Sequence, residues 1–116
     1  MLGREPGGGF IVPPDVLTYT HRKLIVELAA RNLLPGIYAY RVFTAIGGLV
    51  SYGTDLDDQL PQTATYVDRI LRGDNPGELP VQAPTKFKLV INLRTAKALG
   101  LDTAPMLLAR ADEVIE

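Results

Sequence analysis

The residues best suited to chemistry in this chain follow three short apolar runs, at the points where the runs end. They offer a carboxylate, a guanidinium, two phenol rings, a serine and a glycine: Asp15, Tyr40, Arg41, Ser51, Tyr52 and Gly53. If the runs are parallel neighbouring strands, their carboxyl ends meet at one edge, where open sheets bind ligands. Such an edge suits a small zwitterion or carboxylate, with Asp15 facing an ammonium group and Arg41 or the backbone amides of residues 53–55 facing an anion.

Each of these residues also has a structural interpretation. Asp15 either faces a ligand or caps the helix that follows it, and Arg41 either faces a ligand or is a solvated residue at a helix start. Tyr38 and Tyr40 lie two positions apart on one predicted strand, and we expect at least one of them to belong to the core. Tyr52-Gly53 is the strongest candidate, because the turn needs a glycine and the ring lies at the predicted edge.

The remaining candidates for catalysis or metal binding are weak. The chain has no Cys, which excludes disulfides, thiolate metal sites and Cys nucleophiles. His21 is the only histidine and is expected at the surface, without a second ligand nearby. Asp55, Asp57 and Asp58 stand at a predicted helix start, where carboxylates favour the helix dipole. Ser51 lacks a G-x-S-x-G elbow. We therefore predict no metal, no cofactor and no enzymatic activity.

The amino-acid composition is typical of a globular protein. Its 116 residues suffice for one compact domain, with 47% hydrophobic and 22% charged residues. Lys and Arg number 12 against 13 Asp and Glu, so no basic field points to nucleic acid as a partner. No apolar segment indicates a signal peptide or a membrane span. As written, the chain is expected to stay where it is made.

A repeating order of apolar run, polar turn and amphipathic helix predicts an α/β fold with a parallel sheet. After a flexible lead at residues 1–8, the predicted strands are Gly9–Val12, Gly36–Tyr40, Leu49–Tyr52 and Lys86–Asn92, with a strand or tail at Asp112–Glu116. The two lysines of the fourth run are typical of an edge strand. Proline-rich Gly73–Pro84 predicts an extended connector before it.

Helices are predicted between these strands. One begins near Thr20 and buries Leu24, Ile25, Leu28 and Ala29. Others cover Arg41–Ile46, Leu93–Leu99 with Asn92 as its cap and Gly100 at its end, and a segment from Pro105.

A further helix is predicted from an apolar stripe that ends before Gly73: Leu56, Leu60, Ala64, Val67, Ile70 and Leu71. Thr54 and Asp57 have the spacing of a capping box at its start. Because Pro61 would cost roughly 3 kcal/mol inside a helix, we expect the regular part to begin there.

Several stretches, taken in order, resemble one family: Gly8–Asp15, Gly47–Gly53, Ala64–Gly73, Leu79–Leu101 and Leu107–Glu116. They look like the C-terminal third of the ABC-transporter substrate-binding proteins related to tryptophan- and tyrosine-binding lipoproteins. The resemblance covers nearly the whole chain from Gly8 onward, and the stretch through Thr85–Leu101 is the most specific part.

The resemblance implies an incomplete type I periplasmic-binding-protein fold, in which two α/β lobes close on a ligand by hinge motion. Within a partial domain at residues 9–116, it implies that residues 9–46 belong to the C-terminal lobe. Residues 47–75 would cross to the N-terminal lobe and residues 76–116 would return. It also implies that Asp15 and Ser51–Gly53 line the cleft between lobes, so that the strand ends face each other across it.

The implied function is that of a solute-binding component, or a truncated remnant of one, in an ABC-type importer. Its solute would be a small amino-acid-like molecule or organic acid, and its partner an ABC permease. Family members act in the periplasm, whereas the absence of a visible signal points to the cytoplasm. The alternative is a cytoplasmic interaction or sensory domain that keeps the fold without transport. Because most of a family member is absent, we expect open sheet edges and a homodimer formed by strand pairing or swapping.

Overall fold

The computed structural model describes residues 4–116 as two compact units. Unit 1 comprises the described residues up to Gly53 together with Lys88–Glu116, and unit 2 comprises Thr54–Phe87. Residues 1–3 of the expected flexible lead lie outside the described residues. No helix in the described part of the chain combines the length and the apolar character needed to cross a membrane.

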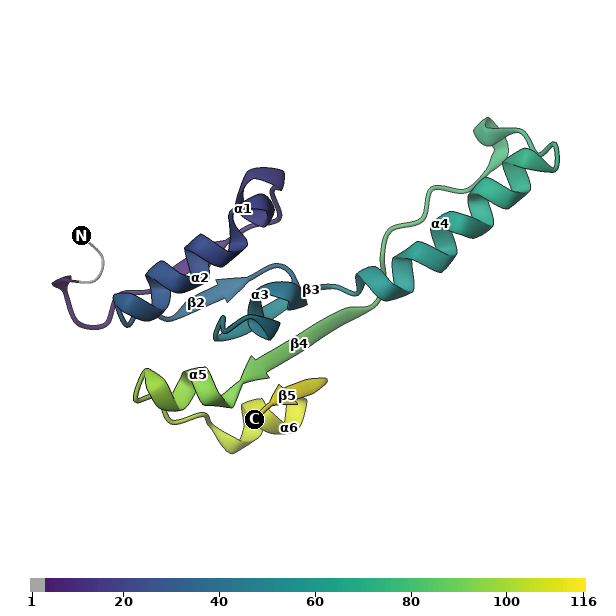
Figure 1. Cartoon of the computed structure of the whole chain (residues 1–116). Coiled ribbons are helices and arrows are strands. Elements are labelled where there is room, and N and C mark those ends of the chain that lie inside the picture. Colours follow the sequence, from purple (N-terminus) through teal and green to yellow (C-terminus); the bar gives the residue numbers. More distant parts are fainter. Residues whose placement is uncertain (1–3) are drawn as a thin grey trace. The chain divides into compact units, whose positions relative to one another are not determined.

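The chain forms a five-stranded sheet with the order β1-β2-β3-β4-β5 (Figure 1). The strands are β1 Phe10–Val12, β2 Gly36–Tyr38, β3 Val50–Thr54, β4 Phe87–Asn92 and β5 Glu113–Ile115. β1, β2 and β3 are parallel neighbours, and β4 and β5 also pair in parallel. The strands alternate with helices along the chain, which confirms the predicted α/β class.

β4 departs from the predicted parallel edge strand in two ways. The amide of Asn92, at the end of β4, donates to the carbonyl of Leu49, just before β3, at 2.9 Å. At the other end of the pair the amide of Asp55 donates to the carbonyl of Lys86 at 3.1 Å, so β4 runs antiparallel to β3. β4 also lies between β3 and β5. The two lysines were misleading, because Lys86 precedes β4 and Lys88 is its second residue, whereas the last three residues of the strand are buried.

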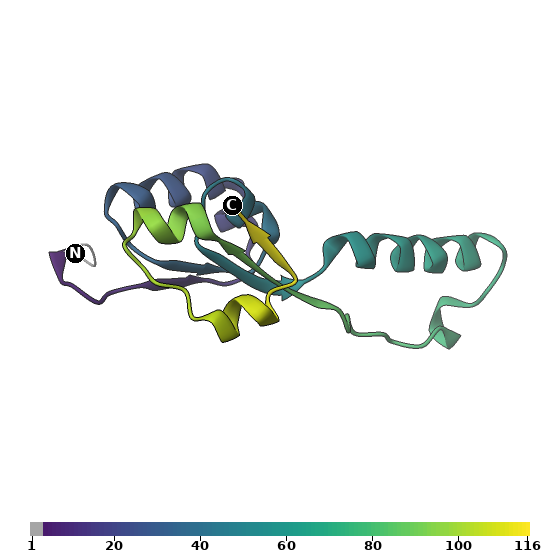
Figure 2. The same cartoon turned by 90° about the horizontal axis from the view of Figure 1, so that it is seen from below.

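Helices cover the two faces of the sheet in unit 1 unequally. They are α1 Val16–Thr20, α2 Arg22–Arg31, α3 Arg41–Ala45, α5 Leu93–Ala98 and α6 Pro105–Arg110. In Figure 2, α2 and α5 lie on one side of the sheet, and α6 lies on the other.

The core beneath α2 and α3 contains Val12, Val26, Tyr38 and Phe43. The rings of Tyr38 and Phe43 stack with their centroids 4.9 Å apart. Burial of this phenol raises the pKa of Tyr38 to about 12.

The region predicted as one helix from Thr20 is two helices. Asp15 caps α1 five residues earlier, and His21 separates α1 from α2. Val26 and Ala29 are buried, whereas Leu24 and Leu28 are exposed. The predicted buried face was therefore wrong for the two leucines. Apolar residues occur on more than one side of α2, so its pattern alone did not fix which side faces the core.

Asn92 joins β4 to α5 as predicted. Its Oδ1 accepts a hydrogen bond from the amide of Thr95 at 3.1 Å, and its Nδ2 donates to the carbonyl of Thr44 at the same distance. The hydroxyl of Thr95 donates to the carbonyl of Gly47 at 2.9 Å. Gly100 follows the helix with a φ of 69°, as expected of a glycine after a helix end. One buried amide thus caps α5 and ties it to α3.

Unit 2 consists of α4 Leu56–Leu71, a short 3-10 helix, η2 Pro76–Glu78, and an extended return. Asp55 caps α4, because its Oδ1 accepts from the amide of Asp57 at 3.1 Å. The predicted capping box at Thr54 and the predicted start at Pro61 are therefore wrong. A cap at Asp55 places Pro61 in the second turn, where it removes one helical hydrogen bond without ending the helix.

A bidentate ion pair joins the start of α3 to β5. Arg41 donates from Nε and Nη2 to the two carboxylate oxygens of Glu113, at 2.6 and 2.5 Å. This hydrogen bonding, helped by the guanidinium charge, lowers the pKa of Glu113. The pair therefore connects elements 72 residues apart in the sequence.

Replacing Asn92 tests its double role. We expect Asn92→Ala to lower the free energy of unfolding by about 2–3 kcal/mol, because it removes a helix cap and leaves the buried carbonyl of Thr44 without its donor. Urea unfolding followed by circular dichroism measures the loss. Asn75→Ala is the matched control, since Asn75 caps η2 by the same kind of contact in an exposed position. Equal losses in the two variants would contradict this role.

The ion pair predicts a loss of stability in acid. A carboxyl group whose pKa is lower in the folded state adds stability above its unfolded pKa of about 4.3, and this stability disappears as the pH falls through the lower folded pKa. When the pH falls below about 4.3, the free energy of unfolding should therefore decrease less in Glu113→Gln than in the wild type. The difference between the two decreases should be under about 1 kcal/mol, because the pair is partly exposed. Thermal unfolding from neutral to acidic pH measures this. Glu27→Gln, in an exposed helix pair with Arg31, is the control, and identical acid profiles for wild type and Glu113→Gln would refute the prediction.

Candidate functional site

The carboxyl ends of β1, β2 and β3 bring the predicted site residues to one edge of unit 1. The register pairs Val12 with Tyr38 and Tyr38 with Ser51, so β1 and β2 end side by side, while β3 continues past them to Thr54. We call the residues at this edge the rim: Asp15, Tyr40, Arg41, Ser51, Tyr52 and Gly53. The ladder pairing of these strands contradicts the expectation that their ends face each other across a cleft.

Asp15 acts as the N-cap of α1, one of the two roles left open by the sequence. Its Oδ1 accepts hydrogen bonds from the amides of Leu17 at 2.8 Å and Thr18 at 3.2 Å. Its Oδ2 makes no hydrogen bond within the described residues, and the residue is exposed. Capping and contact with a ligand are thus compatible, because each uses a different carboxylate oxygen.

Tyr40 is held at the rim by a second aromatic ring that the sequence reasoning missed. The rings of Tyr19 and Tyr40 meet edge to face, with centroids 5.9 Å apart, and the Arg22 guanidinium lies 4.8 Å from the centre of the Tyr19 ring. Such an aromatic pair contributes about 0.5–1.5 kcal/mol beyond its buried area. The available signal was the position of Tyr19, four residues after Asp15 and so on the same side of α1.

The positive charge of Arg41 at the rim is already paired with the carboxylate of Glu113. Arg41 directs two of its donors at Glu113, so an anion at the rim competes with that carboxylate. The amides of residues 53–55 were the alternative anion contact. Of these, the amide of Asp55 already donates to the carbonyl of Lys86 at 3.1 Å.

Ser51 and Gly53 have structural reasons for their identities. Ser51 is buried on the side of the sheet that faces the core, and its hydroxyl has no hydrogen-bond partner within the described residues. A Cβ on Gly53 would lie 2.0 Å from the carbonyl oxygen of Ala39, so only glycine permits this backbone approach. Gly53 is therefore required by close packing and not by a turn. Tyr52, between them, is exposed.

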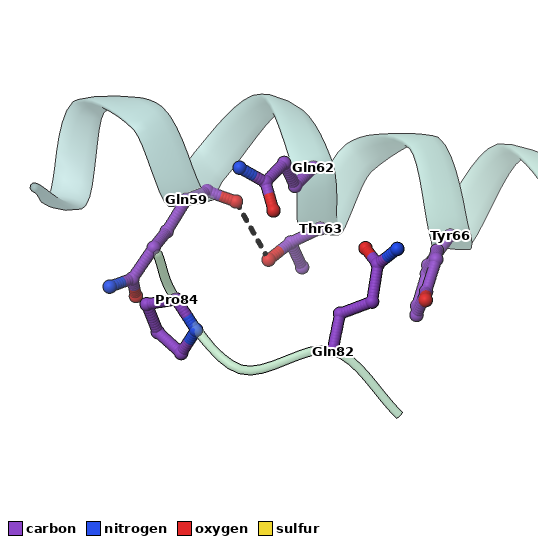
Figure 3. Close-up of a pocket in the computed structure, with 6 residues that line it drawn as sticks. All are labelled: Gln59, Gln62, Thr63, Tyr66, Gln82 and Pro84. Atoms are coloured by element: carbon purple, nitrogen blue, oxygen red, sulfur yellow. Dashed lines mark hydrogen bonds between the residues drawn. The ribbon is translucent and has the colours of Figure 1, made fainter. Parts of the chain in front are cut away.

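A separate small pocket lies in unit 2, between α4 and the return segment (Figure 3). It has a volume of about 160 Å³ and is lined by Gln59, Gln62, Thr63, Tyr66, Gln82 and Pro84. The Thr63 hydroxyl donates to the carbonyl of Gln59 at 3.1 Å, and the Tyr66 hydroxyl donates to the carbonyl of Pro80. Ligand pockets usually measure about 300–1,000 Å³, so this pocket is smaller than a typical ligand site.

Metal ligands do not converge in the described part of the chain. Within residues 4–116, no group of three His, Cys, Asp or Glu side chains could hold a metal ion. His21, between α1 and α2, is exposed and makes no side-chain cap.

Comparison with solved structures gives two close likenesses. A conserved domain protein from Vibrio cholerae O1 biovar El Tor is 30% identical, with a TM-score of 0.87, over 92% of this chain and 36% of its own. The ABC domain in complex with L-Trp from Streptococcus pneumoniae is 25% identical, with a TM-score of 0.86, over 94% of this chain and 37% of its own.

A ligand-free, open substrate binding protein with adhesive properties, from Clostridium difficile, shares the fold at 22% identity and a TM-score of 0.60, over 91% of this chain and 35% of its own. The chain thus spans about a third of the length of these proteins. These likenesses confirm the predicted incomplete fold of the periplasmic-binding-protein type.

The comparison with curated proteins gave no match. The sequence profile of one family, described as ABC transporter substrate binding protein, matches residues 4–115. That match covers nearly all of the sequence, so the chain belongs to the ABC transporter substrate binding protein family.

Proposed function

We propose that this chain is the solute-binding part of an ABC-type importer and that a small amino-acid-like molecule or organic acid binds at the rim. The observation that carries the proposal is the parallel register of β1, β2 and β3, because it places Asp15 after β1 and Tyr40 and Arg41 after β2 at one edge of the sheet. Open α/β sheets bind their ligands at this edge. The partner in transport would be an ABC permease.

Charge and shape favour a zwitterion with a flat side chain. Oδ2 of Asp15 is available for an ammonium group, while Arg41 exchanges part of its pairing with Glu113 for the solute carboxylate. The edge-to-face pair of Tyr19 and Tyr40 supplies an apolar wall with polar tips. The L-Trp complex of the Streptococcus pneumoniae protein supports an amino acid as the solute class.

The two units suggest how the chain contributes to a larger protein. We propose that residues 9–46 belong to a C-terminal lobe, that residues 47–75 cross to an N-terminal lobe and that residues 76–116 return. Thr54–Phe87 forms a separate compact unit, which overlaps the proposed crossing over residues 54–75. The proposed site of action is the periplasm for a longer protein that carries a signal sequence.

Solute binding by the chain itself tests the proposal. Isothermal titration with L-tryptophan, L-tyrosine, L-alanine and succinate should give saturable binding for at least one of them. The bound solute should also raise the melting temperature, since a ligand at a hundred times its Kd adds about 2.7 kcal/mol. The absence of Trp from the chain allows L-tryptophan fluorescence to report binding independently. No binding and no thermal shift across the panel would contradict the proposal and favour an interaction or sensory domain.

Asp15→Asn separates the charge of Asp15 from its capping role. The variant keeps an oxygen for the amides of Leu17 and Thr18, but should weaken binding of amino acids about ten- to a hundredfold, because a hydrogen bond between charged groups contributes about 1.5–3 kcal/mol. Binding of succinate, which has no ammonium group, should not weaken. Asp74→Asn, which removes a carboxylate paired with Arg69 in unit 2, is the control. Equal weakening of amino-acid and succinate binding would show that the charge of Asp15 does not recognise the ammonium group.

A further inference from the structure

Glu113, the first residue of β5, holds the one guanidinium of the rim. Its two carboxylate oxygens accept from Nε and Nη2 of Arg41 at 2.6 and 2.5 Å. Two parallel hydrogen bonds between a guanidinium and a carboxylate are also the geometry in which Arg41 would bind the carboxylate of a solute. Glu113 therefore occupies the same donors that the solute requires.

Asp112, the acidic residue next to Glu113, has a different partner. Its Oδ2 accepts from the amide of Leu89 at 2.7 Å, and its own amide donates to the carbonyl of Leu89 at 2.9 Å. Both contacts join Asp112 to the backbone of β4. The contact from this end of β5 to α3 is therefore made by the Glu113 side chain.

A second cation acts on Glu113 from the neighbouring strand. Val90 of β4 is the register partner of Glu113, and Lys88, two residues before Val90, lies on the same face of the sheet. The pKa of Glu113 is lowered by the hydrogen bonds and the charge of Arg41 and, to a smaller extent, by the charge of Lys88. A Glu113 carboxylate that leaves Arg41 thus stays near a positive charge, which reduces the cost of its displacement.

We propose that Glu113 is an internal competitor of the solute, which occupies Arg41 when the rim is empty and is displaced when a solute carboxylate binds. This inference rests on the proposed solute site and adds a regulatory contact to it. Displacement breaks the ion pair between α3 and β5, so solute binding releases the start of β5 from α3. Arg41, Lys88 and Glu113 all belong to unit 1, so the device is contained within one compact unit.

Competition and release are two sides of one equilibrium. If the solute loosens the contact between Arg41 and Glu113, this contact must weaken solute binding by the same factor. The side chains of Arg41 and Glu113 are 49% and 35% exposed, and partly exposed ion pairs change an affinity by about two- to fivefold. Glu113 therefore lowers the solute affinity of the rim by about this factor.

Isothermal titration with L-tryptophan at neutral pH measures the competition. Glu113→Gln keeps the size of the side chain and removes its charge, so it should bind L-tryptophan about two- to fivefold more tightly than the wild type. Glu27→Gln is the matched control, because it removes the carboxylate of an exposed ion pair with Arg31 in α2, and its affinity should equal that of the wild type. Circular dichroism verifies that both variants are folded.

Carbon-detected NMR of the Glu113 carboxyl group measures the displacement in the wild type itself. Saturating L-tryptophan should shift this signal and the Nε–H signal of Arg41, with one Kd that equals the Kd from the titration. L-Tryptophanamide is the matched ligand control. It keeps the indole and the ammonium group but has no carboxylate, so it should leave the Glu113 signal in place.

The outcomes separate this inference from the proposed function. If L-tryptophan binds but Glu113→Gln binds it no more tightly than the wild type, or only as tightly as Glu27→Gln does, Glu113 does not compete and the inference is wrong while the solute site stands. Binding that leaves the Glu113 carboxyl signal unchanged, or an equal shift with L-tryptophanamide, would also overturn it. If neither the wild type nor Glu113→Gln binds L-tryptophan, L-tyrosine, L-alanine or succinate, the proposed function itself fails, and the competitor with it.

Discussion

The parallel pairing of β1, β2 and β3 is the constraint on which the rest of the structure depends. It aligns the ends of β1 and β2 beside Ser51 of β3 and so assembles the rim from residues far apart in the sequence. It also requires the backbone of β3 to pass close to Ala39, which only Gly53 permits. On one face the sheet buries Tyr38 and Phe43 beneath α2 and α3, while the same pairing aligns Ile11 with Ile37 on the other face.

The rim residues serve the fold and remain available for a ligand at the same time. Asp15 caps α1 with one carboxylate oxygen, and its other oxygen makes no hydrogen bond to residues 4–116. Arg41 links α3 to β5 through Glu113, so a solute carboxylate would loosen an existing connection and not meet an isolated charge. Solute binding at the rim, as proposed, would therefore compete with a contact that connects two elements of the fold.

Much of the fold could be predicted from the sequence, because glycines, prolines and caps mark the ends of its elements. Asn92, Gly100 and Pro105 were sufficient for α5 and α6. The direction of β4 could not be predicted, because a strand with two lysines has the same sequence pattern in parallel and antiparallel pairs. The side of α2 that is buried and the start of α4 at Asp55 depend on tertiary contacts and on one cap. For the rim, the sequence indicated the edge but not the pairing of Arg41 with Glu113.

The most direct test of the account is the location of solute binding by residue-resolved NMR. Amide spectra of the chain titrated with L-tryptophan should show saturable shifts at Asp15, Tyr40 and Ser51–Gly53. The amides of Gln59 and Gln82, in the pocket of Figure 3, should stay unchanged. Saturable shifts confined to Gln59 and Gln82, with none at the rim, would contradict a solute site at the strand ends.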